Sequence, residues 1–166
     1  MYYGEIKYND IANGEGVRTS LFVSGCRLKC KDCFNTATWS FSFGQPFTEA
    51  IQDDVLHSLK PNHVSGLTVL GGEPMEEESQ EALLPFLKKV KETFPKKTVW
   101  LYSGYLHDQD LIPGGRKYTP YTDEILSLVD VMVDGPFVSE LKDITLRFRG
   151  SSNQRLITLK DKISIA

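Results

Sequence analysis

Short, nearly continuous apolar runs alternate along this chain with segments whose apolar residues recur at helical spacing. Runs of the first kind predict buried strands, and segments of the second kind predict helices with one buried face. The predicted strands span 19–25, 67–70, 98–102, 129–133 and 155–159. The predicted helices span 48–59, 77–94 and 122–128. Pro85 should kink or split the second helix, and residues 106–120 read mostly as loop.

This alternation constrains the fold class. Strands that are apolar throughout and are separated by helices predict parallel β-α-β units with right-handed crossovers. A complete eight-stranded barrel needs more than about 200 residues, and the chain has 166. We therefore predict an α/β fold: a single domain over residues 1–166, built as a partial (incomplete) β/α barrel with a mostly parallel, curved sheet. Functional groups in such folds lie at the carboxyl ends of the strands.

Charge and hydropathy exclude several classes of partner. The formal net charge of -3 provides no basic field for phosphates, so we expect no nucleic-acid partner. The first residues form no signal peptide and no later run is long enough to cross a bilayer, so we expect no membrane association and a cytoplasmic location. The three cysteines are odd in number and lie within eight residues, a pattern that suits ligands better than disulfides.

The cysteines Cys26, Cys30 and Cys33 follow the first predicted buried strand. Their spacing lets one loop, 26–33, surround a single inorganic centre. Because the sequence has no fourth cysteine, a 4Fe-4S cluster held here would keep one iron open for another ligand. The alternative is a zinc site in which a histidine is the fourth ligand. None of the three histidines, however, has the short sequence spacing from the cysteines that a zinc finger shows. A purely structural role, with the cysteines buried as small hydrophobic side chains, fits the sequence poorly, since charged residues lie between the cysteines.

Other motifs lie at the same predicted edge of the sheet. Gly71-Gly72-Glu73-Pro74 follows a strand and is either a tight turn or a place where backbone and Glu73 hold a cationic amino group. The residue types from Asn13 to Arg18 are typical of a turn. Residues 147–154 form a polar, cationic segment. We interpret this segment as a solvated surface loop, with contact to an anion or to a partner protein as the alternative.

The cysteine loop resembles the C-x3-C-x2-C signature of the radical S-adenosylmethionine superfamily, and the Gly-Gly-Glu-Pro turn is similar to that superfamily's aminoacid-binding motif. Within the superfamily the chain resembles the small activases of glycyl-radical enzymes over nearly its whole length. The 149–154 stretch favours activases of the anaerobic ribonucleoside-triphosphate reductase over those of pyruvate formate-lyase. Further motifs that carry the resemblance are Asn13-Gly14-x-Gly16-x-Arg18, Leu21 to Cys26, Cys33-Phe34-Asn35, Thr38-Trp39, Gly44 to Thr48 and Val133-Asp134-Gly135.

The resemblance implies a site and a set of partners. Cys26, Cys30 and Cys33 would ligate a 4Fe-4S cluster with one open iron, which S-adenosylmethionine would chelate. The residues implied to hold S-adenosylmethionine are Asp32, Phe34, Gly71, Gly72 and Glu73, with Ser103 and Asp134 as weaker candidates. Many members of the superfamily have an aromatic residue where this chain has Asp32. The implied partners are the large subunit of the reductase and an electron donor such as flavodoxin or ferredoxin.

The implied activity is reductive cleavage of S-adenosylmethionine and formation of a glycyl radical on the reductase. Three alternatives stay open at this point. The chain could activate another glycyl-radical enzyme, such as pyruvate formate-lyase, or act on a small molecule within the same superfamily. In a different class, it could be a small iron–sulfur or zinc-binding module without catalysis, which would neither bind nor cleave S-adenosylmethionine.

Overall fold

A computed structural model of the chain describes residues 1–30 and 36–159. Its strands are β1 (Tyr2–Asp10), β2 (Val17–Val23), β3 (Gln45–Pro46), β4 (Val64–Gly71), β5 (Thr98–Ser103), β6 (Val131–Asp134) and β7 (Arg155–Thr158). Its α-helices are α1 (Glu49–Ser58), α2 (Glu77–Thr93) and α3 (Thr122–Leu128), and two 3-10 helices span Thr36–Trp39 and Ser139–Leu141.

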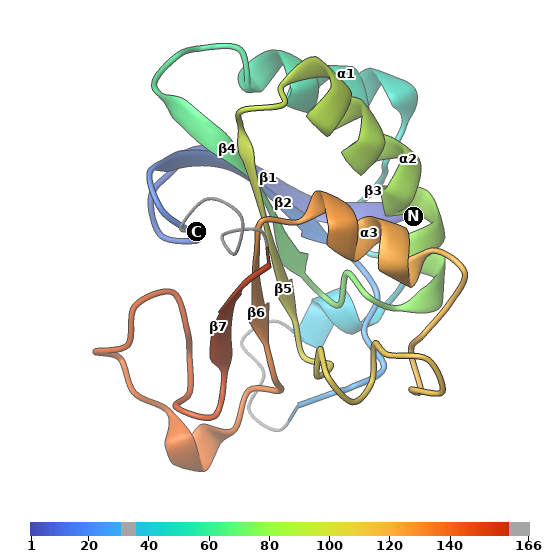
Figure 1. The fold of residues 1–166 in the computed structure, drawn as a ribbon, viewed down its shortest axis with the longest axis vertical. Coiled ribbons are helices and arrows are strands. Elements are labelled where there is room, and N and C mark those ends of the chain that lie inside the picture. The colour runs from blue at the N-terminus through green and yellow to red at the C-terminus, as the bar shows by residue number, and fades with distance from the viewer. Residues whose placement is uncertain (31–35, 160–166) are drawn as a thin grey trace.

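All of these strands form one mixed sheet in the order β3-β1-β2-β4-β5-β6-β7 (Figure 1). The four central strands, β2, β4, β5 and β6, are parallel, which confirms a mostly parallel α/β core. Antiparallel strands flank this core on both sides: β1 pairs with β2, and β7 pairs with β6. The structure thus supports the predicted α/β class as a seven-stranded mixed sheet with three α-helices.

The flanking strands differ from the sequence prediction for a local reason. A parallel neighbour requires a crossover connection, usually a helix, but the segment between β6 and β7 contains only the short 3-10 helix Ser139–Leu141, and β7 returns antiparallel. The strand β1 was not predicted, because its residues are half-buried or exposed and give no apolar run.

The three α-helices cover one face of the sheet (Figure 1). Side chains of the parallel strands on this face, including Leu21, Val69 and Leu101, pack with helical residues in one apolar cluster. Helix α2 supplies Leu83, Phe86, Leu87 and Val90 to that cluster. It continues through Pro85 as one helix and is not split there. None of the helices in the described part of the chain is both long and apolar enough to cross a membrane.

The opposite face of the sheet is covered by loops, and its centre is polar. The side chain of Arg18, on β2, is 1% exposed and crosses β4 to β5. It donates to Thr68 Oγ1 at 2.8 Å, to Thr98 Oγ1 at 2.9 Å, and to three backbone carbonyl oxygens. Its guanidinium lies over Trp100, which in turn makes an edge contact with Phe148 of the loop before β7. Arg18 therefore ties three strands together and supports the loops that cover them.

Candidate active site

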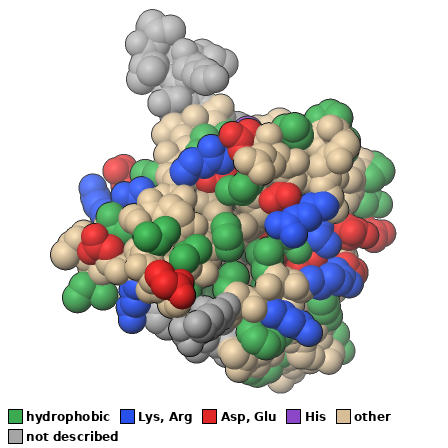
Figure 2. All heavy atoms as spheres, turned by 90° about the horizontal axis from the view of Figure 1, so that it is seen from below, with side chains coloured by type: hydrophobic (Ala, Val, Ile, Leu, Met, Phe, Trp, Pro, Cys, Tyr) green, Lys and Arg blue, Asp and Glu red, His purple; other side chains and the backbone are tan. Residues whose placement is uncertain are grey.

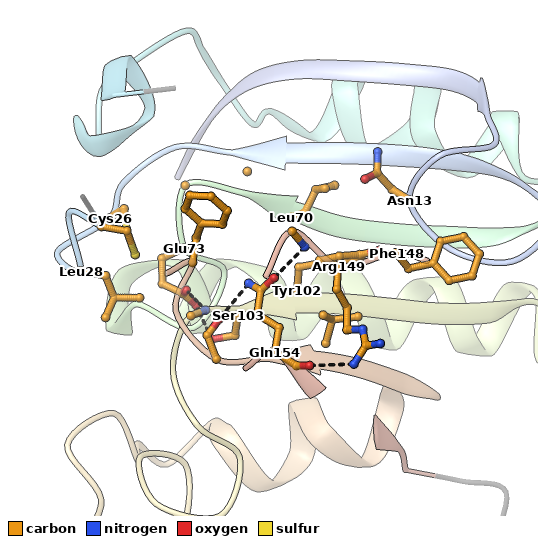
Figure 3. A pocket seen from close by; sticks show the side chains of 18 of the residues that line it. Asn13, Cys26, Leu28, Leu70, Glu73, Tyr102, Ser103, Phe148, Arg149 and Gln154 are labelled. Carbon is orange, nitrogen blue, oxygen red and sulfur yellow. Dashed lines mark hydrogen bonds between the residues drawn. The ribbon is translucent and has the colours of Figure 1, made fainter. Parts of the chain in front are cut away.

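A cavity of about 450 Å³ lies on the loop-covered face at the carboxyl ends of the parallel strands. Figure 2 views the molecule from below Figure 1, at the end where the parallel strands stop, and shows hydrophobic side chains near the middle with basic and acidic side chains around them. In Figure 3 Cys26 and Leu28 lie at one end of the cavity and Asn13 and Phe148 at the other. We call these the cysteine end and the aromatic end of the cavity. Of the residues that sequence analysis placed at this edge of the sheet, Cys26, Cys30, Gly71, Gly72 and Glu73 line this one cavity.

The cysteine end begins where β2 stops. Cys26 is buried and Cys30 is half-buried, both line the cavity, and neither forms a disulfide. Burial raises the pKa of Cys26 to about 11, although backbone N–H groups of Lys29 and Leu28 donate to its sulfur. A metal bound by this sulfur must therefore displace a proton at neutral pH. The predicted site residues Asp32, Cys33 and Phe34 lie outside the described residues.

Both glycines of the Gly-Gly-Glu-Pro turn line the cavity, and both are required by close backbone packing. Gly71 has φ of +113°, and a Cβ there would lie 2.6 Å from the backbone nitrogen and oxygen of Val23. A Cβ on Gly72 would lie 2.8 Å from the carbonyl oxygens of Gly25 and Thr38. The turn thus sits directly against the chain that leads into Cys26, held by Gly72 N–H donating to Val23 O at 2.7 Å.

Glu73 is buried, and its carboxylate is directed to the end of β5. Oε2 accepts hydrogen bonds from Ser103 Oγ at 2.7 Å and Met75 N at 2.8 Å, and Oε1 accepts one from Gly104 N at 2.7 Å. Burial raises the pKa of Glu73 to about 7, against the lowering effect of these three donors. Because Oε1 has a single donor among the described residues, it has capacity for another, such as an ammonium group of a ligand.

Of the two weaker candidates, Ser103 lines the cavity and Asp134 does not. Ser103 holds Glu73 in place through its hydroxyl. Asp134 is fully buried, and its oxygens accept from Arg155 Nε at 2.9 Å, Arg155 Nη2 at 2.5 Å and the backbone N–H of His107 at 2.8 Å. The cation beside Asp134 is therefore Arg155 of β7, and the pair fastens the last strand to the sheet.

The structure adds cavity residues that sequence analysis did not single out as ligands. Tyr102, on β5, lines the cavity, and its buried hydroxyl has no hydrogen-bond partner among the described residues. Arg149 and Gln154 also line it (Figure 3), so the polar loop 147–154 is a wall of the cavity, not merely a solvated surface. The loop's polar sequence was the available signal for Arg149 and Gln154, whereas Tyr102 within an apolar strand gave none.

These donors fit an iron–sulfur cluster together with a small polar ligand. Two thiols face the cavity from one short loop, and thiolates are the usual protein ligands of such clusters. Beside them, Glu73 Oε1 can accept a further hydrogen bond, and the hydroxyl of Tyr102, unpartnered in the described part of the chain, indicates that this cavity accommodates a polar molecule. The remaining lining is largely apolar, as expected of a small-molecule site.

Comparisons with known proteins agree with this chemistry. The model of a family described as "4Fe-4S single cluster domain" matches residues 12–157. Curated relatives named anaerobic ribonucleoside-triphosphate reductase-activating protein include one from Haemophilus influenzae, 40% identical, with 93% of this chain and 96% of the relative covered. One from Escherichia coli K12 is 35% identical with the same coverage. One from Enterobacteria phage T4 is 35% identical, with 98% of this chain and 97% of the relative covered.

Proposed function

Because the chain belongs to the family of anaerobic ribonucleoside-triphosphate reductase-activating proteins, we propose that the cavity is the active site of a radical S-adenosylmethionine activase. The activase generates a glycyl radical on the reductase. The observation that carries the proposal is that the cysteine loop and the Gly-Gly-Glu-Pro turn, far apart in sequence, line one cavity. No described residue of the cavity favours pyruvate formate-lyase as the target.

The cysteines Cys26, Cys30 and Cys33 hold the 4Fe-4S cluster in this proposal. A bound and reduced cluster would supply the electron for reductive cleavage of S-adenosylmethionine, and with it the radical chemistry that removes a hydrogen atom from a glycine of the reductase. The protein's contribution is position. The buried loop before Cys26 and the backbone bonds to the Gly71-Gly72 turn fix where the sulfur of Cys26 lies.

S-adenosylmethionine is held by residues on both sides of the cysteine end. Gly71 and Gly72 let its aminoacid group approach the backbone, and Glu73 accepts a hydrogen bond from the ammonium through Oε1, which has only the Gly104 donor among the described residues. We also propose Asp32 and Phe34, which lie outside the described residues, as the residues that bind the nucleoside. The amino group thus faces a buried carboxylate that three donors hold in place, and a cationic ligand would stabilise its charged form against the cost of burial.

The loop-covered face gives the reductase access. We propose that residues 1–166 form one radical S-adenosylmethionine domain and that its sheet is a partial β/α barrel, incomplete on the side of the cavity. A glycine within a large protein can reach the cofactor only as a loop, and a wall made of the 147–154 segment and Asn13 admits a loop more readily than a closed ring of strands. We also propose a cytoplasmic location and an electron donor such as flavodoxin or ferredoxin.

One experiment tests the activity. The chain is reconstituted with iron and sulfide without oxygen, reduced, and supplied with S-adenosylmethionine; we expect 5'-deoxyadenosine, and with the reductase added, a glycyl-radical doublet in electron paramagnetic resonance. Cys30→Ser should abolish both signals, whereas Ser42→Ala, an exposed polar change in the loop that follows, should leave both unchanged. Zinc without iron in the anaerobically purified protein, or absence of 5'-deoxyadenosine from the loaded wild type, contradicts the proposal.

A further inference from the structure

Glu76 is a fully buried carboxylate outside the Gly-Gly-Glu-Pro turn, immediately before the first residue of α2. A side-chain oxygen at the N-cap position can accept hydrogen bonds from the helix's free N–H groups, although glutamate is not a preferred N-cap residue. Its side chain makes no such bond. Instead it crosses to the cysteine loop, which is 49 residues earlier in sequence.

Three hydrogen bonds and one ion pair with a buried lysine hold this carboxylate. Oε2 accepts from the backbone N–H of Arg27 at 2.6 Å and from Tyr105 OH at 2.9 Å. Oε1 accepts from Arg27 Nη1 at 3.2 Å and forms an ion pair with Lys117 Nζ, which lies 2.9 Å away. The side chain of Lys117 is only 11% exposed, so it supplies the buried counter-charge, while that of Arg27 is 48% exposed. A short bond from a backbone amide to a buried, paired carboxylate is among the stronger hydrogen bonds in proteins.

The backbone bond acts next to a cluster ligand. Arg27 directly follows Cys26, whose own backbone N–H donates to Trp39 O at 3.2 Å. The chain is therefore fastened through the amide of Cys26 and again through the amide of the next residue. With peptide units fixed on both sides of its Cα, Cys26 has little freedom to move its sulfur.

We propose that Glu76 is a positioning residue for the cluster, which fixes the cysteine loop through the amide of Arg27 while Lys117 and Tyr105 hold the carboxylate. This inference rests on the proposed function. Glu76 does not line the cavity; it acts through the backbone beside Cys26. Groups that orient metal ligands commonly change metal affinity or activity by about 10–100-fold when they are removed.

The test uses the full chain, reconstituted anaerobically, and measures the rate of iron release to a chelator together with the electron paramagnetic resonance spectrum of the reduced cluster. We expect Glu76→Met to release iron about 10–100-fold faster and to alter the spectrum. Glu76→Gln keeps an oxygen that can accept a hydrogen bond from Arg27 N, so the rate of iron release should increase less in this variant than in Glu76→Met. This graded rescue is expected of a specific acceptor.

Two matched controls separate the backbone bond from the surface ion pair. Glu78 pairs with the guanidinium of the same Arg27 at 2.6 Å, but it is exposed and accepts no hydrogen bond from the described backbone of the cysteine loop. Glu78→Gln and Arg27→Met should therefore stay within about twofold of wild type, because both leave the Arg27 amide bonded to Glu76. An Arg27→Met rate equal to that of Glu76→Met would overturn the inference, as would iron release from Glu76→Met at the wild-type rate.

Glu76→Met leaves Lys117 buried without its main partner and could unfold for that reason. The double variant Glu76→Met/Lys117→Met removes both charges and is measured alongside it, with thermal unfolding as the check on folding. A folded double variant that loses iron as fast as Glu76→Met supports the inference, and one that retains iron as wild type does overturns it. A wild-type protein that takes up no cluster contradicts the proposed function instead.

Discussion

The two faces of the sheet carry different kinds of side chain. On the helix-covered face, strand and helix side chains form one apolar cluster whose members are almost all fully buried. On the loop-covered face, the same strands carry a buried arginine, a phenol without a partner among the described residues, and the cavity. The comparison teaches that the helix-covered face accounts for most of the stability, whereas the loop-covered face holds polar groups at sites where they can serve binding and catalysis. The following changes test that division.

The largest loss of stability should come from the helix-covered face. Phe86 of α2 is fully buried and makes an edge contact with Phe47 at 5.1 Å between ring centroids. Phe86→Ala should lower the free energy of unfolding by about 3–5 kcal/mol, because it removes a large apolar side chain and leaves a cavity. Denaturant titration measures this loss. A reduced affinity of the remaining folded protein for S-adenosylmethionine would show that the two faces are coupled.

Glu73 lies where the sheet meets the cavity and should make stability depend on pH. Its folded pKa of about 7 lies above the usual value of 4.5, so the folded state binds a proton that the unfolded state releases between these values. Stability should therefore fall by up to about 3 kcal/mol as pH rises from about 4.5 to about 7, and level off above. Glu73→Gln should lose this slope when unfolding is measured across that range. An unchanged slope would assign it to other groups.

Arg18 tests whether the polar face also contributes to the fold. Arg18→Met removes five hydrogen bonds and leaves buried oxygens without donors, but it also relieves the burial of a cation that no carboxylate pairs with in the described chain. We expect a net loss of about 2 kcal/mol in thermal or denaturant unfolding. Arg18→Lys should recover only part of it, since one ammonium cannot reach all five acceptors. A loss larger than that of Phe86→Ala would reverse the comparison.

Tyr102 should give the smallest effect. Its buried hydroxyl has no partner among the described residues, so Tyr102→Phe removes a polar atom that stabilises nothing. The free energy of unfolding should stay within about 1 kcal/mol of wild type or rise. The packing of the side chain is preserved in this variant, because phenylalanine keeps the ring and lacks only the hydroxyl. A clear loss of stability would mean that a partner of the hydroxyl contributes to the fold.

The sequence predicted the parallel core well, because each of its strands is a buried apolar run and each helix has one apolar stripe. It did not predict β1, whose residues are too exposed to form such a run. It also did not predict that β7 pairs antiparallel with β6, because that direction depends on the path of the connecting segment from Pro136 to Gln154. Pro85 was expected to interrupt α2, but the helix continues through it.

The site was predictable where chemistry lies in a short motif. Cys26, Cys30 and the Gly71 to Glu73 turn line one cavity, as expected from their positions at strand ends. The role of Glu76 could not be read from sequence, because an acidic run at the start of a helix is ordinary helix chemistry. Arg155 as the partner of Asp134 was equally hidden, since only the fold brings β7 beside β6.

The bond between Arg27 and Glu76 joins segments 49 residues apart, and this has a consequence for biosynthesis. A ribosome releases the cysteines early, while the carboxylate that fixes their loop emerges later and its counter-charge Lys117 later still. A nascent chain that displays all three thiols therefore lacks the anchor of the loop. With Glu76 in the role proposed above, durable cluster insertion is expected only after most of the chain has been synthesised and the sheet has formed.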